Sequence, residues 1–299
     1  MFHGTITALV TPFHAGEVDE DVLRAHIERQ IEAGVDGLVP VGTTGEAATL
    51  SHEEHKRVIA ITVEQTAGRV PVIAGTGSNN TAESIELTKA AKALGADAAL
   101  LISPYYNKPT QEGIYEHYRA VAEAVHLPQI IYNVPGRTNS NITPDTVGRL
   151  SAIPNIVGIK DATADLAQLA ASMEAAEGRM EFYSGDDATV LPFLVMGGQG
   201  VISVVSNVTP RTMHALTQAA RMGDWEQARC LQFAMRRLIE ALFIQSNPIP
   251  IKAACWMLGW MENELRLPLT PLTSEAMERL RQAMESFDSG LERLELVRT

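Results

Sequence analysis

The residue with the clearest chemical potential is a lysine at the end of a short apolar stretch, residues 156–160. The β-branched residues of this stretch predict a buried strand that ends in Lys160. Burial removes water from an ammonium group and lowers its pKa from a reference of about 10.4, and the resulting neutral amine can attack a carbonyl. From this strand alone, the alternative of a Lys160 that leaves the strand and points into solvent stays open.

Further reactive side chains follow the other apolar stretches, each at the point where a strand is expected to end. In a barrel of alternating strands and helices, the reactive residues gather at the carboxyl ends of the strands. We therefore expect these side chains to converge with Lys160 on one mouth, which favours a nucleophilic role for this lysine. The hydroxyl groups, tyrosines and arginine at these points are Thr43, Thr44, Tyr105, Tyr106, Tyr132, Arg137, Ser184 and Ser203.

Apolar runs and amphipathic helical stretches alternate through the first three-quarters of the chain. The expected strands are 5–10, 37–41, 70–74, 98–102, 129–134, 156–160, 181–184 and 200–205. The expected helices are 19–32, 52–66 (with Ser51 and Glu54 as a capping box), 81–94, 111–125, 144–152, 165–176, 188–196 and 210–222. Strict alternation implies parallel strands, and eight such units predict an α/β fold, the (β/α)8 TIM barrel. The competing doubly wound sheet more commonly has about five or six strands.

The pattern changes after residue 222, where no further strand is expected. Helices are predicted over 224–245, 249–259 and 274–285. We therefore expect a catalytic barrel over 1–222 and a C-terminal helical extension over 223–299. Met235, Leu238, Ile239 and Leu242 form an apolar stripe at helical spacing, which core packing or a subunit contact explains better than a cofactor site.

Composition excludes several classes of function. The 299 residues are 45% hydrophobic and carry a formal net charge of -12, so the chain has no general attraction to nucleic acid or anionic membranes. Cys230 and Cys255 fit small apolar residues in a reducing cytoplasm, where we expect the protein to reside. The N-terminus does not resemble a signal peptide, and no apolar run approaches the roughly 20 residues of a membrane span.

No metal or nucleotide motif is expected to function. His52 and His55 stand three residues apart, whereas a zinc-protease helix has the pattern His-Glu-x-x-His. The Gly75-Thr76-Gly77 turn lacks the remainder of a phosphate-binding loop, and Asp186-Asp187 is explained by turn or cap roles.

Four motifs occur in order along nearly the whole chain: Gly-Thr-Thr-Gly-Glu at 42–46, Tyr-Asn-Val-Pro at 132–135, Gly-Ile-Lys at 158–160 and Asn-Pro-Ile-Pro at 247–250. This ordered set resembles the dihydrodipicolinate synthase family, within the class I, pyruvate-dependent aldolase superfamily that includes N-acetylneuraminate lyase. The resemblance implies that Lys160 forms a Schiff base with pyruvate and that no separate cofactor is needed. The resulting enamine would attack the aldehyde of L-aspartate-4-semialdehyde, in the first committed step of diaminopimelate and lysine biosynthesis.

The resemblance also implies roles for the residues around Lys160. Tyr132 would be the proton shuttle, and Thr43 would link it to Tyr106, which in this family reaches in from a neighbouring subunit. Thr44 would hold the pyruvate carboxylate. The alternatives are a Tyr132 that is only a core aromatic with a satisfied hydroxyl, and a Gly-Thr-Thr-Gly stretch that is only a tight turn.

Arg137 is the residue that the resemblance ties most closely to substrate choice. A guanidinium matches a carboxylate in two-pronged geometry, and the family uses this arginine for the carboxylate of the semialdehyde. Gly185 and Ile202 would also contact substrate. Gly136, where many synthases have serine, and Asp161, where glutamate is common, depart from the pattern.

Two rival functions remain at this point. A related aldolase or dehydratase for a 2-keto-3-deoxy sugar acid or a hydroxyproline-derived keto acid would also use Lys160 and Tyr132, but Arg137 argues against it. A non-catalytic binding or structural paralogue would be free to lose Lys160 or Tyr132, and both are present.

Assembly and regulation follow only from the resemblance, which implies a homotetramer built from tight dimers. L-lysine, the end product, would bind at the tight-dimer interface as a feedback inhibitor. The matching positions, in which Ala47 replaces a common serine, are Ala47, Ala48, His52, His55, Asn79, Glu83 and Tyr105. The alternative is that these residues only line a polar interface.

Overall fold

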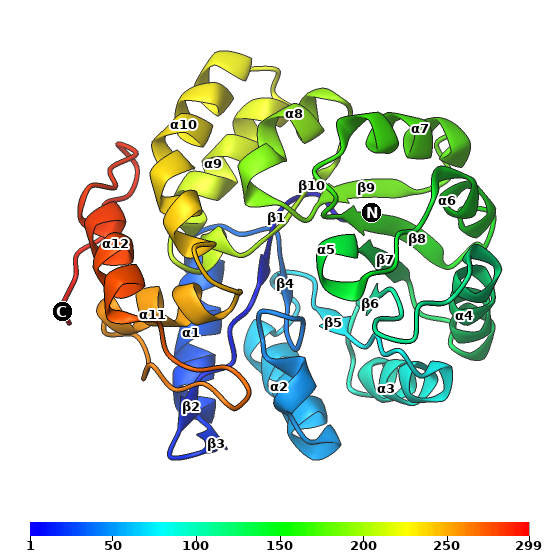
Figure 1. The fold of residues 1–299 in the computed structure, drawn as a ribbon, viewed down its shortest axis with the longest axis horizontal. Helices are drawn as coiled ribbons and strands as arrows, with labels where there is room; N and C mark the ends of the chain where they lie inside the picture. Colours follow the sequence, from blue (N-terminus) through cyan, green and yellow to red (C-terminus); the bar gives the residue numbers. More distant parts are fainter. Residues whose placement is uncertain (299) are drawn as a thin grey trace.

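The computed structural model describes residues 1–298 and contains one closed barrel of eight parallel strands (Figure 1). The strands are β1 (Gly4–Ala8), β4 (Gly37–Val39), β5 (Ile73–Gly75), β6 (Ala98–Ile102), β7 (Gln129–Asn133), β8 (Ile156–Asp161), β9 (Glu181–Ser184) and β10 (Gly200–Ser203). They lie in the order β4-β1-β10-β9-β8-β7-β6-β5. A parallel bridge between Leu38 and Val72 joins the two outer strands, which closes the barrel and confirms the predicted fold class.

Helices surround the barrel, and each main helix follows a strand as expected. They are α1 (Glu20–Glu32), α2 (His52–Thr66), α3 (Thr81–Ala93), α4 (Gln111–Ala124), α6 (Pro144–Leu150), α7 (Leu166–Ala176), α8 (Val190–Val195) and α9 (Pro210–Arg221). The predicted capping box is confirmed, because Ser51 accepts from the Glu54 amide while the Glu54 carboxylate accepts from the Ser51 amide. These local hydrogen bonds therefore fix the start of α2 directly after the loop that follows β4.

Three strand boundaries differ from expectation for identifiable reasons. Strand β4 ends at Val39, and the chain turns sharply at Val41, which has a φ of 49°. Strand β5 begins only at Ile73, since Pro71 has no amide hydrogen for a ladder. Strand β10 ends at Ser203 because the Asp187 carboxylate, rather than a strand, accepts from the amide of Val204.

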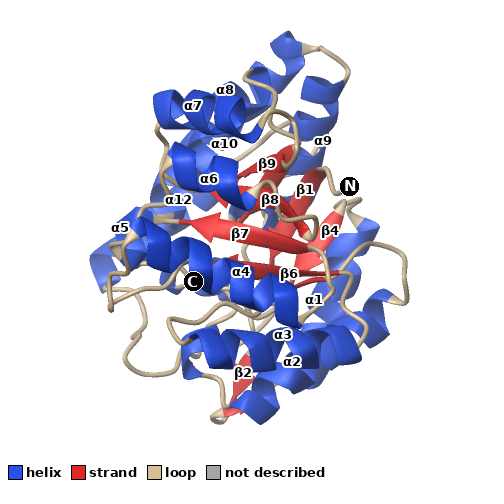
Figure 2. Cartoon of the chain, turned by 90° about the vertical axis from the view of Figure 1, so that its right-hand side faces the viewer, coloured by secondary structure: helices blue, strands red, loops and turns tan. Residues whose placement is uncertain are grey.

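The sequence did not predict several short elements. A hairpin of β2 (Phe13–His14) and β3 (Glu17–Val18) precedes α1. The other short elements, all in loops after barrel strands, are η1 (Ala47–Thr49), α5 (Pro135–Thr138), η2 (Asp187–Thr189) and η3 (Val205–Asn207). Figure 2 shows β7 pointing towards α5, so this short helix lies at the carboxyl end of its strand.

Three C-terminal helices pack on one side of the barrel (Figure 1): α10 (Trp225–Leu242), α11 (Ile249–Met257) and α12 (Ser274–Glu285). The stripe of Met235, Leu238, Ile239 and Leu242 is buried within the chain, which makes it core. It belongs to one apolar cluster with residues of β10 and α9. Residue Gly223, with a φ of 78°, turns the chain between α9 and α10, and the division into domains at this point stays a prediction.

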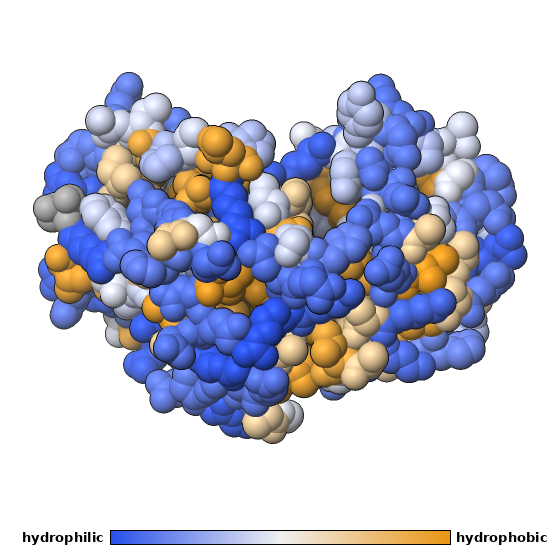
Figure 3. Space-filling view, turned by 90° about the horizontal axis from the view of Figure 1, so that it is seen from below, coloured by the Kyte–Doolittle hydropathy of each residue, from blue (hydrophilic) through white to orange (hydrophobic). Residues whose placement is uncertain are grey.

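The cysteines differ from expectation in one respect. Cys255 is buried as a small apolar residue, but Cys230 is exposed on α10, because it faces away from the apolar stripe. Within residues 1–298, no helix has the length and apolar character needed to cross a bilayer. Figure 3 shows one face of the molecule, on which hydrophilic side chains predominate and apolar side chains form smaller areas between them.

Candidate active site

Lys160 lies inside the barrel near the carboxyl end of β8, between tyrosines of the two neighbouring strands. The parallel register pairs Lys160 with Tyr132 of β7 and with Tyr183 of β9. Its side chain does not leave the strand for solvent, since only 5% of the residue is exposed. The Lys160 Nζ atom lies 4.3 Å from the centre of the Tyr132 ring.

The surroundings of Lys160 make its amine unusually acidic. The pKa of Lys160 is lowered to about 8, mainly by burial, while the charge of Asp187 opposes the shift and that of Arg137 adds to it. A larger fraction of the amine is therefore neutral near pH 7 than for an exposed lysine. This is the property that a carbonyl-attacking lysine needs.

Tyr132 is buried against Lys160, in the apolar cluster that fills the barrel. Burial raises the pKa of Tyr132 to about 12, with Arg137 opposing this shift, so its hydroxyl keeps its proton at neutral pH. A phenol in this state can donate a hydrogen bond and exchange a proton with a neighbouring atom. Tyr132 thus has the position and the protonation state for a proton shuttle.

Gly185 and Ile202 lie where the resemblance places substrate contacts. A Cβ atom at Gly185 would come within 2.9 Å of the Lys160 Cε atom, so a larger residue would displace the lysine. Ile202 is buried on β10 and belongs to the same apolar cluster as Tyr132. Gly185 therefore shapes the space around the lysine side chain, and Ile202 adds to the apolar surroundings of Tyr132.

The turn after β4 is tight and is tied to the C-terminal helices. The amides of Gly45 and Glu46 donate to the carbonyls of Gly42 and Thr43, respectively. Thr44 is 3% exposed, and its hydroxyl accepts a hydrogen bond of 2.9 Å from the Asn247 side chain. The same asparagine accepts, through its carbonyl, a hydrogen bond of 3.0 Å from the Arg137 guanidinium.

Arg137 is exposed in α5, and its charge acts on both Lys160 and Tyr132. Asn247 therefore joins Thr44 and Arg137, the two groups expected to bind carboxylates. In the sequence, Asn247 is visible only as part of the Asn-Pro-Ile-Pro motif, which indicates no role for it. Only a contact between segments 203 residues apart reveals it.

Asp187 is a second residue whose importance the sequence did not reveal. Its carboxylate is buried and accepts from the Ser203 hydroxyl at 2.5 Å and from the Val204 amide at 3.0 Å. Burial raises the pKa of Asp187 to about 6, which leaves it mainly ionised at neutral pH. The expected cap role describes its hydrogen bonds, and its charge also acts on Lys160.

Thr43 and Tyr106 do not join Tyr132 within this chain. Tyr106, in the loop after β6, is 89% exposed and has a φ of 70°. Thr43 is half-buried in the turn after β4. Among residues 1–298, no hydrogen bond connects the Tyr132 hydroxyl to either side chain. The described chain therefore does not by itself form the predicted hydrogen-bonded relay through Thr43, Tyr106 and Tyr132.

Comparisons with known proteins identify the family of this chain. The family model described as "Dihydrodipicolinate synthetase family" matches residues 1–287. The chain belongs to this family. A 4-hydroxy-tetrahydrodipicolinate synthase of Nitratidesulfovibrio vulgaris is 53% identical over 286 residues, which cover 95% of this chain and 98% of the relative.

Two solved structures add information about ligands in the dihydrodipicolinate synthetase family. A chloride-inhibited dihydrodipicolinate synthase from Acinetobacter baumannii, complexed with pyruvate, is 50% identical with a TM-score of 0.95 and covers 98% of this chain and 100% of its own. The enzyme from Cyanidioschyzon merolae with lysine bound is 43% identical with a TM-score of 0.93 and covers 97% of this chain and 99% of its own.

The residues predicted to bind L-lysine gather on an outer edge of the barrel, between the starts of α2 and α3. The Glu83 carboxylate accepts from His52 at 2.9 Å and from the Ser78 hydroxyl, and these two bonds lower the pKa of Glu83. His55 is buried, and its ring donates to the Gly75 carbonyl at 2.8 Å.

Two further members of the predicted lysine site are also held in place. The Asn79 amide donates to the carbonyl of Tyr105 at 3.2 Å, which links α3 to the loop that carries Tyr106. Ala48 is exposed and Ala47 is half-buried in η1. The structure therefore brings His52 to Glu83 and Asn79 to the Tyr105 carbonyl, so several polar groups of the set already have partners within the chain.

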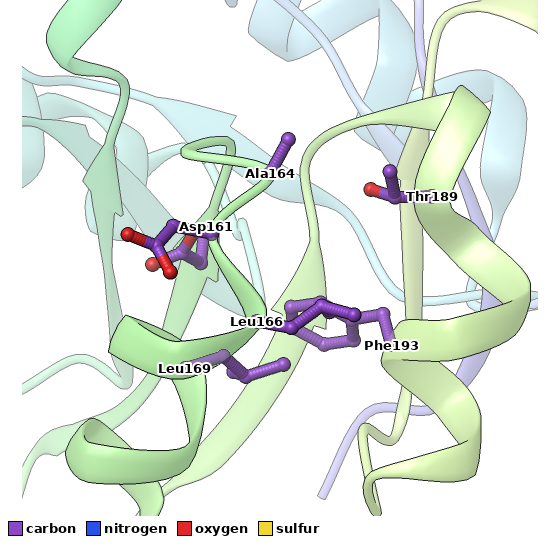
Figure 4. Close-up of a pocket in the computed structure, with 7 residues that line it drawn as sticks. Asp161, Ala164, Leu166, Leu169, Thr189 and Phe193 are labelled. Atoms are coloured by element: carbon purple, nitrogen blue, oxygen red, sulfur yellow. The ribbon is translucent and has the colours of Figure 1, made fainter.

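A separate small pocket lies between the start of α7 and α8 (Figure 4). Asp161 lines it together with Leu166 and Phe193. Its volume of about 10 Å³ matches the space of a single water molecule, so it cannot hold pyruvate. Asp161 is thus separated from the lysine in the way that strand alternation predicts. Among the described residues, no group of three or more His, Cys, Asp or Glu side chains has the arrangement of a metal site.

Proposed function

We propose that this chain condenses pyruvate with L-aspartate-4-semialdehyde to form 4-hydroxy-tetrahydrodipicolinate, the first committed step of diaminopimelate and lysine biosynthesis. The observation that carries the proposal is the buried amine of Lys160, with its pKa near 8, against the Tyr132 ring in a chain of this family. The reaction needs no separate cofactor, because the Schiff base on Lys160 serves as the electron sink. The cytoplasm, which supplies both substrates, is the proposed location.

The chemistry begins when the neutral Lys160 amine attacks the keto carbon of pyruvate. Loss of water gives an iminium, and the methyl carbon then loses a proton to form an enamine. The enamine carbon attacks the aldehyde carbon of the semialdehyde, whose oxygen takes up a proton. The amino group of the second substrate then attacks the iminium carbon, which closes the ring and releases Lys160 as a free amine.

The residues around Lys160 have distinct tasks in this sequence. Tyr132 carries protons between the amine, the departing water and the aldehyde oxygen, because its hydroxyl is protonated and its ring lies against the lysine. Thr44 and the surrounding backbone hold the pyruvate carboxylate. Arg137 holds the carboxylate of the semialdehyde by charge-assisted hydrogen bonds.

The proposed assembly is a homotetramer of tight dimers in which Tyr106 completes the site of a neighbouring subunit. The support is that Tyr106 is 89% exposed and held in a left-handed conformation, so its ring is presented outward. Sedimentation and activity measured together test this assembly. A fully active monomer would contradict the shared site, whereas loss of activity on dilution to monomers supports it.

L-lysine is the proposed feedback inhibitor at the outer edge around Glu83. A free amino acid presents an ammonium group, which Glu83 can bind, and a carboxylate, which Asn79 and Tyr105 can contact. Ala47, in place of a common serine, removes one hydroxyl from this set.

Borohydride trapping is the direct test of the main proposal. Pyruvate and borohydride should add a stable mass to Lys160 in the intact protein, and the same protein should consume pyruvate only when the semialdehyde is present. Lys252 is an internal control, since it is also buried but its ammonium donates to Glu46 at 2.6 Å. Labelling at Lys252, or no labelling, would refute the mechanism.

A further inference from the structure

A buried ion pair lies directly behind the turn that is proposed to hold pyruvate. The Lys252 Nζ atom of α11 donates to Glu46 Oε1 at 2.6 Å, and both side chains are 0% exposed. Glu46 stands only two residues after Thr44, while Lys252 lies 206 residues further along the chain. This ion pair therefore links the turn after β4 directly to the C-terminal helices.

The Glu46 carboxylate is fully engaged. Its second oxygen accepts from the backbone amide of Arg266 at 3.1 Å. The Lys252 ammonium also lies 4.1 Å from the centre of the Phe13 ring, which limits its freedom to move. Glu46 itself has a φ of 54°, so the backbone at this point is held in a conformation that a free turn would rarely adopt.

Stability alone is a weak explanation for such a pair. Removing two charges from water offsets much of their attraction, and replacement of a buried pair by neutral residues of similar volume is often neutral or stabilising. What the pair supplies is a fixed geometry, because two charges in an apolar setting tolerate few arrangements. The geometry that it fixes here is that of residues 43–46.

The same C-terminal segment reaches the site a second time. Asn247, five residues before Lys252, donates to the Thr44 hydroxyl and accepts from Arg137. Asn247 therefore holds Thr44 directly, and Lys252 holds the same turn through Glu46. A shift of Lys252 would move Glu46 and, through it, the backbone of Thr43 and Thr44.

We propose that Glu46 and Lys252 are positioning residues for the Thr43-Thr44 turn, so that the C-terminal helices set the affinity of the site for the pyruvate carboxylate. This inference rests on the proposed function, in which that turn binds pyruvate. Neither residue touches the substrate, and their effect reaches it only through the turn.

The test uses the full-length double variant Glu46→Gln/Lys252→Met, which removes both charges and keeps similar volumes. We expect a folded protein whose half-saturating pyruvate concentration for borohydride trapping rises roughly tenfold to a hundredfold, since displacement of a binding group by about 1 Å has effects of this size. The trapping rate at saturating pyruvate should fall much less. A loss of stability alone would lower the amount of active protein without this change in half-saturation.

Glu292→Gln provides the matched control in the C-terminal region. Glu292 accepts from the Thr212 amide at 2.8 Å and holds the C-terminal segment to α9, away from residues 42–47. Its variant should keep the wild-type half-saturation for pyruvate. If the double variant does not fold, Glu46→Gln alone, which keeps an oxygen for the Arg266 amide, is measured in the same way.

The outcomes separate the two proposals. Failure of the wild-type protein to trap pyruvate at Lys160 would overturn the proposed function and this inference with it. Wild-type trapping together with an unchanged half-saturation in the folded double variant would overturn the positioning role alone. A raised half-saturation in the double variant, but not in Glu292→Gln, supports it.

Discussion

Two clusters of polar residues at the carboxyl side of the barrel, one around Lys160 and one around Glu83, differ in their exposure to solvent. Lys160 is 5% exposed, and burial is the main cause of its lowered pKa. At the outer edge, the side chains of His52 and Glu83 are 46% and 35% exposed, and the pKa of Glu83 is lowered by hydrogen bonds instead. Tyr106 is more exposed than either of them.

This difference indicates where chemistry and regulation belong. A desolvated amine has altered reactivity before any ligand arrives, so the mouth around Lys160 is prepared for reaction. Exposed groups interact weakly across water, so the outer edge gains strength only when a ligand or a second surface excludes that water. We therefore expect variants at the mouth to change catalysis and variants at the edge to change the response to L-lysine.

The largest effect should come from Lys160→Ala. Without the amine, no Schiff base forms, and kcat should fall by roughly 10⁴-fold or more, as when other enzymes lose a covalent nucleophile. Steady-state assay and borohydride trapping measure this loss. Residual activity within tenfold of wild type would show that the mouth is not the reaction centre.

Tyr132→Phe should lower kcat by about 10²- to 10⁴-fold, the usual contribution of a general acid–base group. Tyr115 of α4, whose ring centre lies 3.9 Å from the Arg149 guanidinium carbon, supplies the control variant Tyr115→Phe. That variant should keep its turnover. Equal loss of turnover in both variants would count against a proton shuttle at Tyr132.

Arg137→Ala should retain pyruvate trapping while kcat/KM for the semialdehyde falls by roughly 10- to 150-fold. This range corresponds to the loss of about 1.5–3 kcal/mol from a charge-assisted hydrogen bond. Arg137→Lys keeps the charge and should recover part of the loss. Unchanged semialdehyde kinetics in Arg137→Ala would exclude a carboxylate-binding role.

Inhibition by L-lysine should respond to Glu83→Ala and not to Glu86→Ala, which removes an exposed carboxylate from the same helix. A coupling of about 1–3 kcal/mol is typical of such regulation and corresponds to roughly 5- to 150-fold in affinity. The measurement is a lysine titration of the steady-state rate. If millimolar lysine leaves the wild-type rate unchanged, the proposed regulatory role of the edge around Glu83 is refuted.

The pH dependence of trapping should reveal the pKa of Lys160. Only the neutral amine reacts, so the rate should rise about tenfold per pH unit below pH 8 and level off above it. Asp187→Asn removes a negative charge that favours the ammonium form, so the midpoint should move to lower pH. Asp186→Asn is the neighbouring control, and an equal shift in both variants would contradict the role of Asp187.

The sequence predicted the order of elements well because the signals are local. Helix α2 begins after Ser51, since a capping box needs only residues within one turn. The predicted end of β10 was wrong because it depends on a contact from elsewhere, the Asp187 carboxylate. Short elements such as α5 have too few residues for a periodic pattern.

The candidate site divides in the same way. By itself the sequence determined that Lys160 lies near the end of a strand and that tyrosines, threonines and an arginine follow neighbouring strands. Local patterns of hydrophobic residues are enough to predict the alternation and order of strands and helices. Only the tertiary structure decided that Lys160 is desolvated, that Asp187 acts on its charge and that Glu46 meets Lys252. Desolvation and ion pairing depend on which distant segments pack together, and that information is distributed over the whole chain.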